Sequence, residues 1–189
     1  MGQIEKTIEV YERLRKNIYR ISIEDGTVID LKFFRENYHH LAGYQHLGDF
    51  PDISAPLQGT DQFYREIKNK TIKESQLRQS TKFESIAKRI EFFGKLEEIL
   101  MAGESKIIVE FDDTKVDSII KAIYFLYKRE GTPYSDDYII FILFIGYDYD
   151  KHKYFPTTYI VEDSPKYLSG QDTYYCTIEV IPRKKKKRT

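Results

Sequence analysis

Apolar and polar positions divide the chain into a mainly helical first part and a strand-rich second part. Apolar residues at helical spacing predict amphipathic helices over residues 4–15, 61–69 and 81–100. Alternation or short continuous apolar runs predict strands over residues 18–23, 28–33, 106–111, 138–147, 154–161 and 174–181. Residues 119–128 fit a helix and a strand equally well. This order predicts an α+β fold, in which an N-terminal hairpin and helices pack on a mostly antiparallel sheet of four or more strands.

Turn residues mark the ends of several elements. Asp25-Gly26 separates the first two predicted strands, because glycine adopts the positive φ values of a two-residue hairpin turn. Residues 51–60 contain two prolines and a glycine, which predict a loop suited to act as a lid or a binding loop. No linker divides the chain, so we expect one domain over residues 1–182 and a basic tail over residues 183–189. The 81–100 helix carries one continuous apolar stripe of Phe83, Ile86, Ile90, Phe93, Leu96 and Leu100.

A helical face pattern also covers residues 33–47, which contain three of the four histidines. Phe34, Tyr38 and Leu41 recur at spacings of four and three, so they share one side. His39 and His46 fall on another side, where we expect ordinary surface residues. The helix would bury Phe34 and Leu41 and offer His40 at the edge of the core. The strip that contains His40 is formed by Asn37, His40, Tyr44 and Leu47.

The same segment resembles the signature of a known family. Residues 37–47 read Asn-Tyr-His-His-Leu-Ala-Gly-Tyr-Gln-His-Leu, similar to the pattern Asn-x-x-His-Leu-x-Gly-Leu-x-x-Leu. That pattern is typical of the fourth group of phage-associated nuclease-like proteins, a phage- and plasmid-borne family related to barnase, EndoU, colicins and RelE. Tyr44 and His46 depart from its commoner residues. Three later segments, 124–128, 156–159 and 167–171, extend the resemblance.

The resemblance implies an α+β fold and a toxin-like or phage-conflict ribonuclease that acts on structured or single-stranded RNA. It also favours a strand for the second half of residues 119–128. In such an enzyme His40 would be the acid–base residue, since imidazole titrates near neutral pH. Lys128 or Lys153 would stabilise negative charge on the phosphate. The resemblance adds Thr157 and Gln171 as catalytic candidates, and Asn37 and Tyr159 as substrate-binding candidates. Tyr44 and Tyr154 are further substrate-binding candidates, since exposed tyrosines could stack on unpaired bases.

Charge is unevenly distributed along the chain. The net charge is zero, but residues 183–188 hold six basic side chains, which leaves 24 basic against 30 acidic residues elsewhere. A block of like charges stays solvated and attracts phosphate without sequence preference. A phosphate-binding tail and a plain solubility tail or non-native extension are equally compatible with it. The acidic remainder argues against a wide nucleic-acid groove, although a local basic pocket would fit.

Several classes of protein find no support in the sequence. His39 and His46 lie about two helical turns, or ~10.5 Å, apart, too far to share one metal ion unaided. Nucleotide-binding glycine loops and serine or cysteine hydrolase signatures are missing, so we expect neither a metal nor a cofactor. The single cysteine, Cys176, is expected in the core. No secretory signal or membrane span is apparent, so we expect a cytoplasmic protein with no membrane partner.

Less specific interpretations fit the same residues. His40 could be a hydrogen-bonding residue at the core edge, and Gly43 could serve only close packing of the helix. Tyrosines are more often part of a core or sheet surface than of a stacking platform. The alternative to an RNA enzyme is a non-enzymatic phage or plasmid module that docks a host protein or nucleic acid. A structural domain of a larger assembly is a third class. RNA and a neutralising or host protein are therefore the expected partners.

Overall fold

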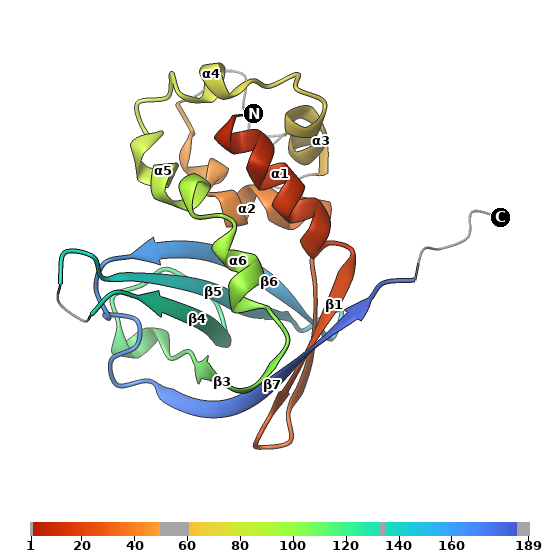
Figure 1. Ribbon diagram of the computed structural model, residues 1–189, viewed down its shortest axis with the longest axis vertical. Helices are drawn as coiled ribbons and strands as arrows, with labels where there is room; N and C mark the ends of the chain where they lie inside the picture. Colours follow the sequence, from red (N-terminus) through yellow and green to blue (C-terminus); the bar gives the residue numbers. More distant parts are fainter. Residues whose placement is uncertain (1, 50–60, 133–134, 185–189) are drawn as a thin grey trace.

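Helices and strands occupy separate layers of the protein (Figure 1). The computed structural model describes residues 2–49, 61–132 and 135–184. The loop predicted over residues 51–60 lies outside these ranges. The helices are α1 (Gln3–Leu14), α2 (Tyr38–Ala42), α3 (Asp61–Lys68), α4 (Glu74–Leu77), α5 (Glu84–Glu91) and α6 (Lys95–Ile99). Short 3-10 turns span Arg35–Asn37, Tyr44–His46 and Asp113–Lys115.

The second layer is one seven-stranded sheet with the order β2-β1-β7-β3-β4-β5-β6. Every neighbouring pair is antiparallel. The edge strands β2 and β6 approach each other, so the sheet curls into a nearly closed barrel. The strands are β1 (Asn17–Ile23), β2 (Val28–Lys32), β3 (Gly103–Glu110), β4 (Tyr124–Glu130), β5 (Ile139–Asp148), β6 (Lys153–Glu162) and β7 (Asp172–Pro182).

The predicted α+β class and antiparallel sheet are confirmed. Residues 119–123 form no regular element and β4 follows them, as the resemblance favoured. The single helix predicted over residues 81–100 is wrong, since the chain turns between α5 and α6 at Phe92–Gly94. The hydroxyl of Tyr159 donates to the carbonyl oxygen of Phe92 at 2.9 Å, which satisfies an acceptor that the interrupted helix leaves free. The sequence pattern did not predict α4.

The segment 33–47 is also shorter in helix than predicted. Only residues 38–42 are α-helical, because Gly43 follows with φ +84° and ends the helix in the left-handed conformation. A 3-10 turn then continues to His46. Asn37 starts the segment, since its Oδ1 accepts a hydrogen bond from the backbone of Phe34 at 2.9 Å. Tyr38 and Leu41 of the predicted side are nevertheless buried. Phe34, which was predicted to be buried with them, is only partly buried, because its backbone is extended and the α-helix begins at Tyr38.

The hydrophobic core lies on both faces of the curled sheet. Successive residues of β5 contribute to opposite faces: Phe141 and Leu143 face the helices, whereas Ile142 and Phe144 join a second cluster under residues 111–127. Cys176 on β7 is buried as predicted, and burial raises the pKa of its thiol to about 11. Among the described helices, none combines the length and apolar character that crossing a bilayer requires.

The first residue of the predicted tail contacts the body. Arg183 donates from Nη1 to the carbonyl oxygens of Phe33 and Arg15, at 3.1 and 3.3 Å. Its guanidinium carbon lies 5.1 Å from the ring centre of Phe34, a cation–π geometry. Residues 185–189 lie outside the described ranges.

Aromatic contacts join the helices to the sheet. Phe93 is 1% exposed, and its ring lies 6.1–6.4 Å, centre to centre, from Tyr11 on α1, Tyr38 on α2 and Tyr159 on β6. We expect Phe93→Ala to lower the free energy of unfolding by about 3–5 kcal/mol, because it opens a cavity where three elements meet. Urea denaturation measures this. Tyr149→Ala, at a ring 73% exposed, is the control and should cost under about 1 kcal/mol. Equal losses in both variants would contradict this view of the core.

Candidate active site

The side chain of His40 lines a cleft of about 680 Å³ between the helical layer and the edge of the sheet. The segment after β2 carries α2 against β6, which brings the helix and the last strands together. Polar side chains from α2, the following 3-10 turn, α5 and β6 line the cleft, together with residues 117–121. They are His40, Gln45, His46, Arg89, Thr157 and Glu162.

The two adjacent histidines of α2 have different surroundings. His39 is 3% exposed, so its predicted place on the surface is wrong. Its Nδ1 donates to the carbonyl oxygen of Glu36 at 2.9 Å, and burial, followed by the charge of His40, lowers its pKa to about 4. The His40 ring lies 3.7 Å from the His39 ring, centre to centre, and is open to the cleft. Partial desolvation lowers the pKa of His40 below its ordinary value, which keeps the imidazole neutral near pH 7.

Thr157 owes its position to an irregularity in β6. Phe144 pairs with Thr158 and Ile145 pairs with Pro156, so Thr157 is the extra residue of a β-bulge. A bulge changes the direction in which a side chain points, and the Thr157 Oγ1 atom is buried in the cleft wall without a hydrogen-bond partner. A Cβ atom on Gly146 of β5 would lie 2.6 Å from this oxygen, so glycine there leaves room for the hydroxyl.

Arg89 enters the cleft from α5 beside Gly43. A Cβ atom on Gly43 would lie 3.1 Å from Arg89 Cδ, 3.3 Å from Arg89 Nη1 and 2.8 Å from Ile86 Cγ2. The glycine therefore permits both the left-handed turn after α2 and the close approach of the arginine. Burial lowers the pKa of the guanidinium, against the opposing charge of Glu162. The Nη1 atom of Arg89 is buried and has no hydrogen-bond partner.

The 3-10 turn after Gly43 adds Gln45 and His46. The Oε1 atom of Gln45 is a third buried polar atom of the cleft without a partner. Burial is the main cause that lowers the pKa of His46, and the charges of Arg89, His40 and Lys82 lower it further. Arg89 and His40 therefore both lie within electrostatic reach of His46.

The other predicted catalytic residues do not line this cleft. Lys128 on β4 contacts Glu98 and forms an ion pair with Glu130 at 3.1 Å. The Gln171 amide bridges the backbone of Asp112, accepting from its nitrogen at 2.9 Å and donating to its oxygen at 3.1 Å. These contacts hold the sheet and its connections together.

The predicted substrate-binding residues also lie elsewhere. Tyr44 and Tyr159 are 1% and 0% exposed, so both rings belong to the core. Asn37 is 9% exposed and holds the turn before α2. Tyr154 is half-buried and packs on Tyr147, with ring centres 4.8 Å apart. Lys153 lies over the ring of Phe34.

Sequence reasoning missed Arg89 and Gln45. Arg89 lies between Ile86 and Ile90, at the edge of the apolar stripe. A charged residue in this position is the feature of the sequence that could have indicated a functional role. Nothing in the sequence shows that Gly43 touches α5. Within the described part of the chain, no group of three or more His, Cys, Asp or Glu side chains could hold a metal ion.

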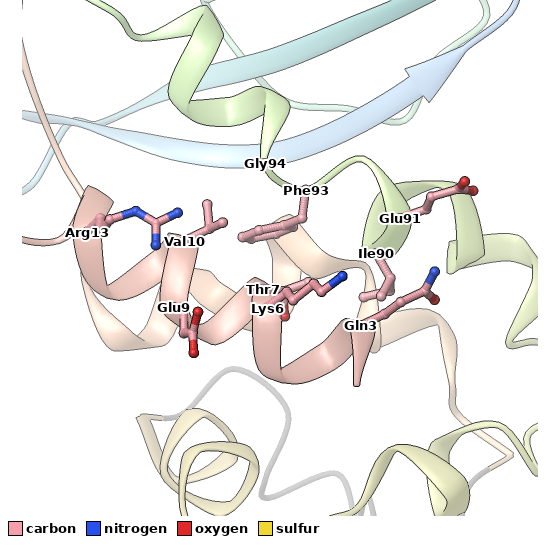
Figure 2. A pocket seen from close by; sticks show the side chains of 10 residues that line it. All are labelled: Gln3, Lys6, Thr7, Glu9, Val10, Arg13, Ile90, Glu91, Phe93 and Gly94. Atoms are coloured by element: carbon pink, nitrogen blue, oxygen red, sulfur yellow. The ribbon is translucent and has the colours of Figure 1, made fainter. Parts of the chain in front are cut away.

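A second cavity, of about 460 Å³, lies between α1, the end of α5 and the turn before α6 (Figure 2). The apolar side chains of Val10, Ile90 and Phe93 lie between these elements. Charges of both signs, from Lys6, Glu9, Arg13 and Glu91, complete the lining. This cavity contains no histidine, so acid–base chemistry near neutral pH points to the His40 cleft instead.

Comparisons with known proteins point to one family. A family model described as phage-Barnase-EndoU-ColicinE5/D-RelE like nuclease4 matches residues 3–187. Neither the curated proteins nor the solved structures include a match to this chain. The matched range contains all residues of the cleft.

Gly43 and Gly26 provide a matched pair that isolates the contact with Arg89. Both have positive φ, but a Cβ on Gly26 would meet nothing within 4 Å. We expect Gly26→Ala to cost about 1–2 kcal/mol of backbone strain. Gly43→Ala should cost about 1–3 kcal/mol more, because the new methyl group displaces Ile86 and Arg89. Urea denaturation measures both, and equal losses would mean that Gly43 is needed for its backbone alone.

His39 makes stability depend on pH. Its folded pKa of about 4 lies below the ordinary 6.5, so the unfolded state binds more protons between these values. The stabilisation is therefore complete above pH 6.5 and is lost as the pH falls toward 4. His39→Asn, whose amide can still donate to Glu36, should lose less stability than the parent between pH 7 and pH 5. Urea midpoints across this range test it, and parallel curves would contradict it.

Proposed function

The chain belongs to the phage-Barnase-EndoU-ColicinE5/D-RelE like nuclease4 family, and from this premise we propose that it is an RNA endonuclease that uses no metal ion and whose active site is the His40 cleft. One observation carries the proposal. The imidazole of His40 and the unpartnered hydroxyl of Thr157 share one cleft, although they come from distant parts of the chain. A base and a donor that line one cleft are the groups that acid–base cleavage of a phosphodiester requires.

The lowered pKa of His40 favours the role of a base. A neutral imidazole accepts the proton of the RNA 2′-hydroxyl while that oxygen attacks the adjacent phosphorus. The bond from phosphorus to the 5′-oxygen then breaks, which leaves a 2′,3′-cyclic phosphate and a 5′-hydroxyl. Bound phosphate favours the protonated form of a nearby imidazole, so His46 is the group in the cleft suited to protonate the leaving oxygen.

Thr157 would stabilise the negative charge that develops on the phosphate oxygens during this step. Its Oγ1 has no partner among the described residues, so it is available to donate to a phosphate oxygen. The bulge in β6 fixes its direction before substrate binds, and a donor placed in advance costs little reorganisation in the transition state. Because the attacking group is the 2′-hydroxyl, the substrate is RNA and not DNA.

The family also supports a biological role. Its description places the chain among phage-associated nuclease-like proteins related to colicins and RelE. A toxin or phage-conflict role follows, with cellular RNA as the target and a neutralising protein as a partner. The acidic excess outside residues 183–188 gives such a partner a charged surface to recognise.

Cleavage of single-stranded RNA in the presence of a chelator tests the proposal. We expect the parent to cleave with EDTA present and to spare the same sequence made of DNA. His40→Ala should reduce kcat by roughly 10²–10⁴-fold, because it removes the acid–base group. Thr157→Val, which keeps the shape but removes the hydroxyl, should reduce kcat by about 10²-fold.

A matched control separates catalysis from a general histidine effect. His152→Asn changes an exposed histidine whose φ of +46° asparagine tolerates, so activity should stay unchanged. Equal activity of parent and His40→Ala, or cleavage that requires an added divalent cation, would remove the proposal. RNA binding without any cleavage would support the non-enzymatic binding module instead.

A further inference from the structure

Arg89 forms no ion pair within the described part of the protein. Its side chain is partly buried, its Nη1 atom has no partner among these residues, and burial lowers its pKa. Glu162 is the main charge that opposes this shift, but its carboxylate pairs with Lys166 at 3.5 Å. A guanidinium that is held away from water without an ionic partner destabilises the folded protein, so binding of an anion to it stabilises the fold.

The surroundings of Arg89 have the polar groups that an oxyanion would use. The Oγ1 atom of Thr157 is a donor without a partner among the described residues in the same cleft, and His40 and His46 line the cleft as well. Glu162 and Asp117 contribute negative charge to the lining. A ligand must therefore be recognised by direct hydrogen bonds and not by an overall positive field.

Packing fixes where the guanidinium lies. Gly43 follows the last residue of α2, and its missing side chain lets Cδ and Nη1 of Arg89 approach the end of this helix. The planar guanidinium is therefore held in one place near the helix that carries His40 and does not move freely in solvent. Arginine held in this way matches the two oxygens of a phosphate better than a lysine would.

We propose that Arg89 forms the phosphate-binding site of this cleft and holds the phosphodiester of a nucleic acid between itself and His40. The inference rests on the proposed function and names the group that binds the phosphate. A residue that only fills space beside Gly43 would explain the packing, but it would not explain a charged guanidinium whose Nη1 has no partner among the described residues and whose charge lowers the pKa of His46.

Thermal unfolding in phosphate tests the site without any turnover. In sodium chloride, Arg89→Met should have a higher Tm than the parent, because methionine keeps the volume and removes an unpaired buried charge. In sodium phosphate of the same ionic strength, the Tm of the parent should rise and that of Arg89→Met should not. Arg20→Met, at an exposed arginine paired with Asp30 at 2.8 Å, is the control and should keep the full phosphate response.

Binding of a short oligodeoxynucleotide tests the ligand class. It lacks the 2′-hydroxyl and stays intact, so affinity is measured apart from cleavage. Arg89→Met should weaken binding by roughly 10–100-fold, the value of charge-assisted hydrogen bonds, and Arg89→Lys should fall between the two. His40→Ala keeps Arg89, so it should lose less affinity than Arg89→Met while failing to cleave RNA.

The outcomes separate the two proposals. Phosphate and oligonucleotide binding that depend on Arg89 support the site, even where no RNA is cleaved and the nuclease proposal fails. A phosphate response of the same size in the parent and Arg89→Met overturns it, whether or not RNA is cleaved. A response to inorganic phosphate with no oligonucleotide binding also overturns it, because the ligand would then be free phosphate.

Discussion

The close approach of Gly43 to α5 is the contact on which the cleft depends. Its left-handed backbone ends α2 three residues after His40, and its lack of a side chain admits Ile86 and Arg89. A longer helix would continue past this point and carry the following residues away from α5. Gly43 therefore determines both the end of the helix that carries His40 and the close approach of Arg89 to that end.

The curled sheet supplies the opposite wall. Because both faces of β5 are buried, the neighbouring edge strand β6 is held firmly and can carry a bulge without losing its pairing. Thr157 is the residue that the bulge redirects, and Gly146 leaves space for its hydroxyl. The chemistry thus lies where a short helix meets an irregular strand edge, and the core around Phe93 holds the two layers in register.

The sequence predicts the elements and the central histidine, but not its neighbours. His40 follows from a local motif, and the strands follow from local alternation. Lys128 and Gln171 lie outside the cleft, and the sequence could not show this, because it does not reveal which side chains meet across a curled sheet. Arg89 depends on a contact between segments far apart in the chain, which no local pattern contains.

A crystal structure with an RNA oligonucleotide methylated at its 2′-oxygens tests the central claim most directly, since this ligand binds but cannot be cleaved by the 2′-oxygen. The account predicts a phosphate in the His40 cleft, with one oxygen within about 2.7–3.2 Å of Arg89 Nη1 and another near Thr157 Oγ1. The methylated 2′-oxygen of the preceding ribose should face His40. An oligonucleotide bound elsewhere on the protein, with the cleft empty, would contradict the account.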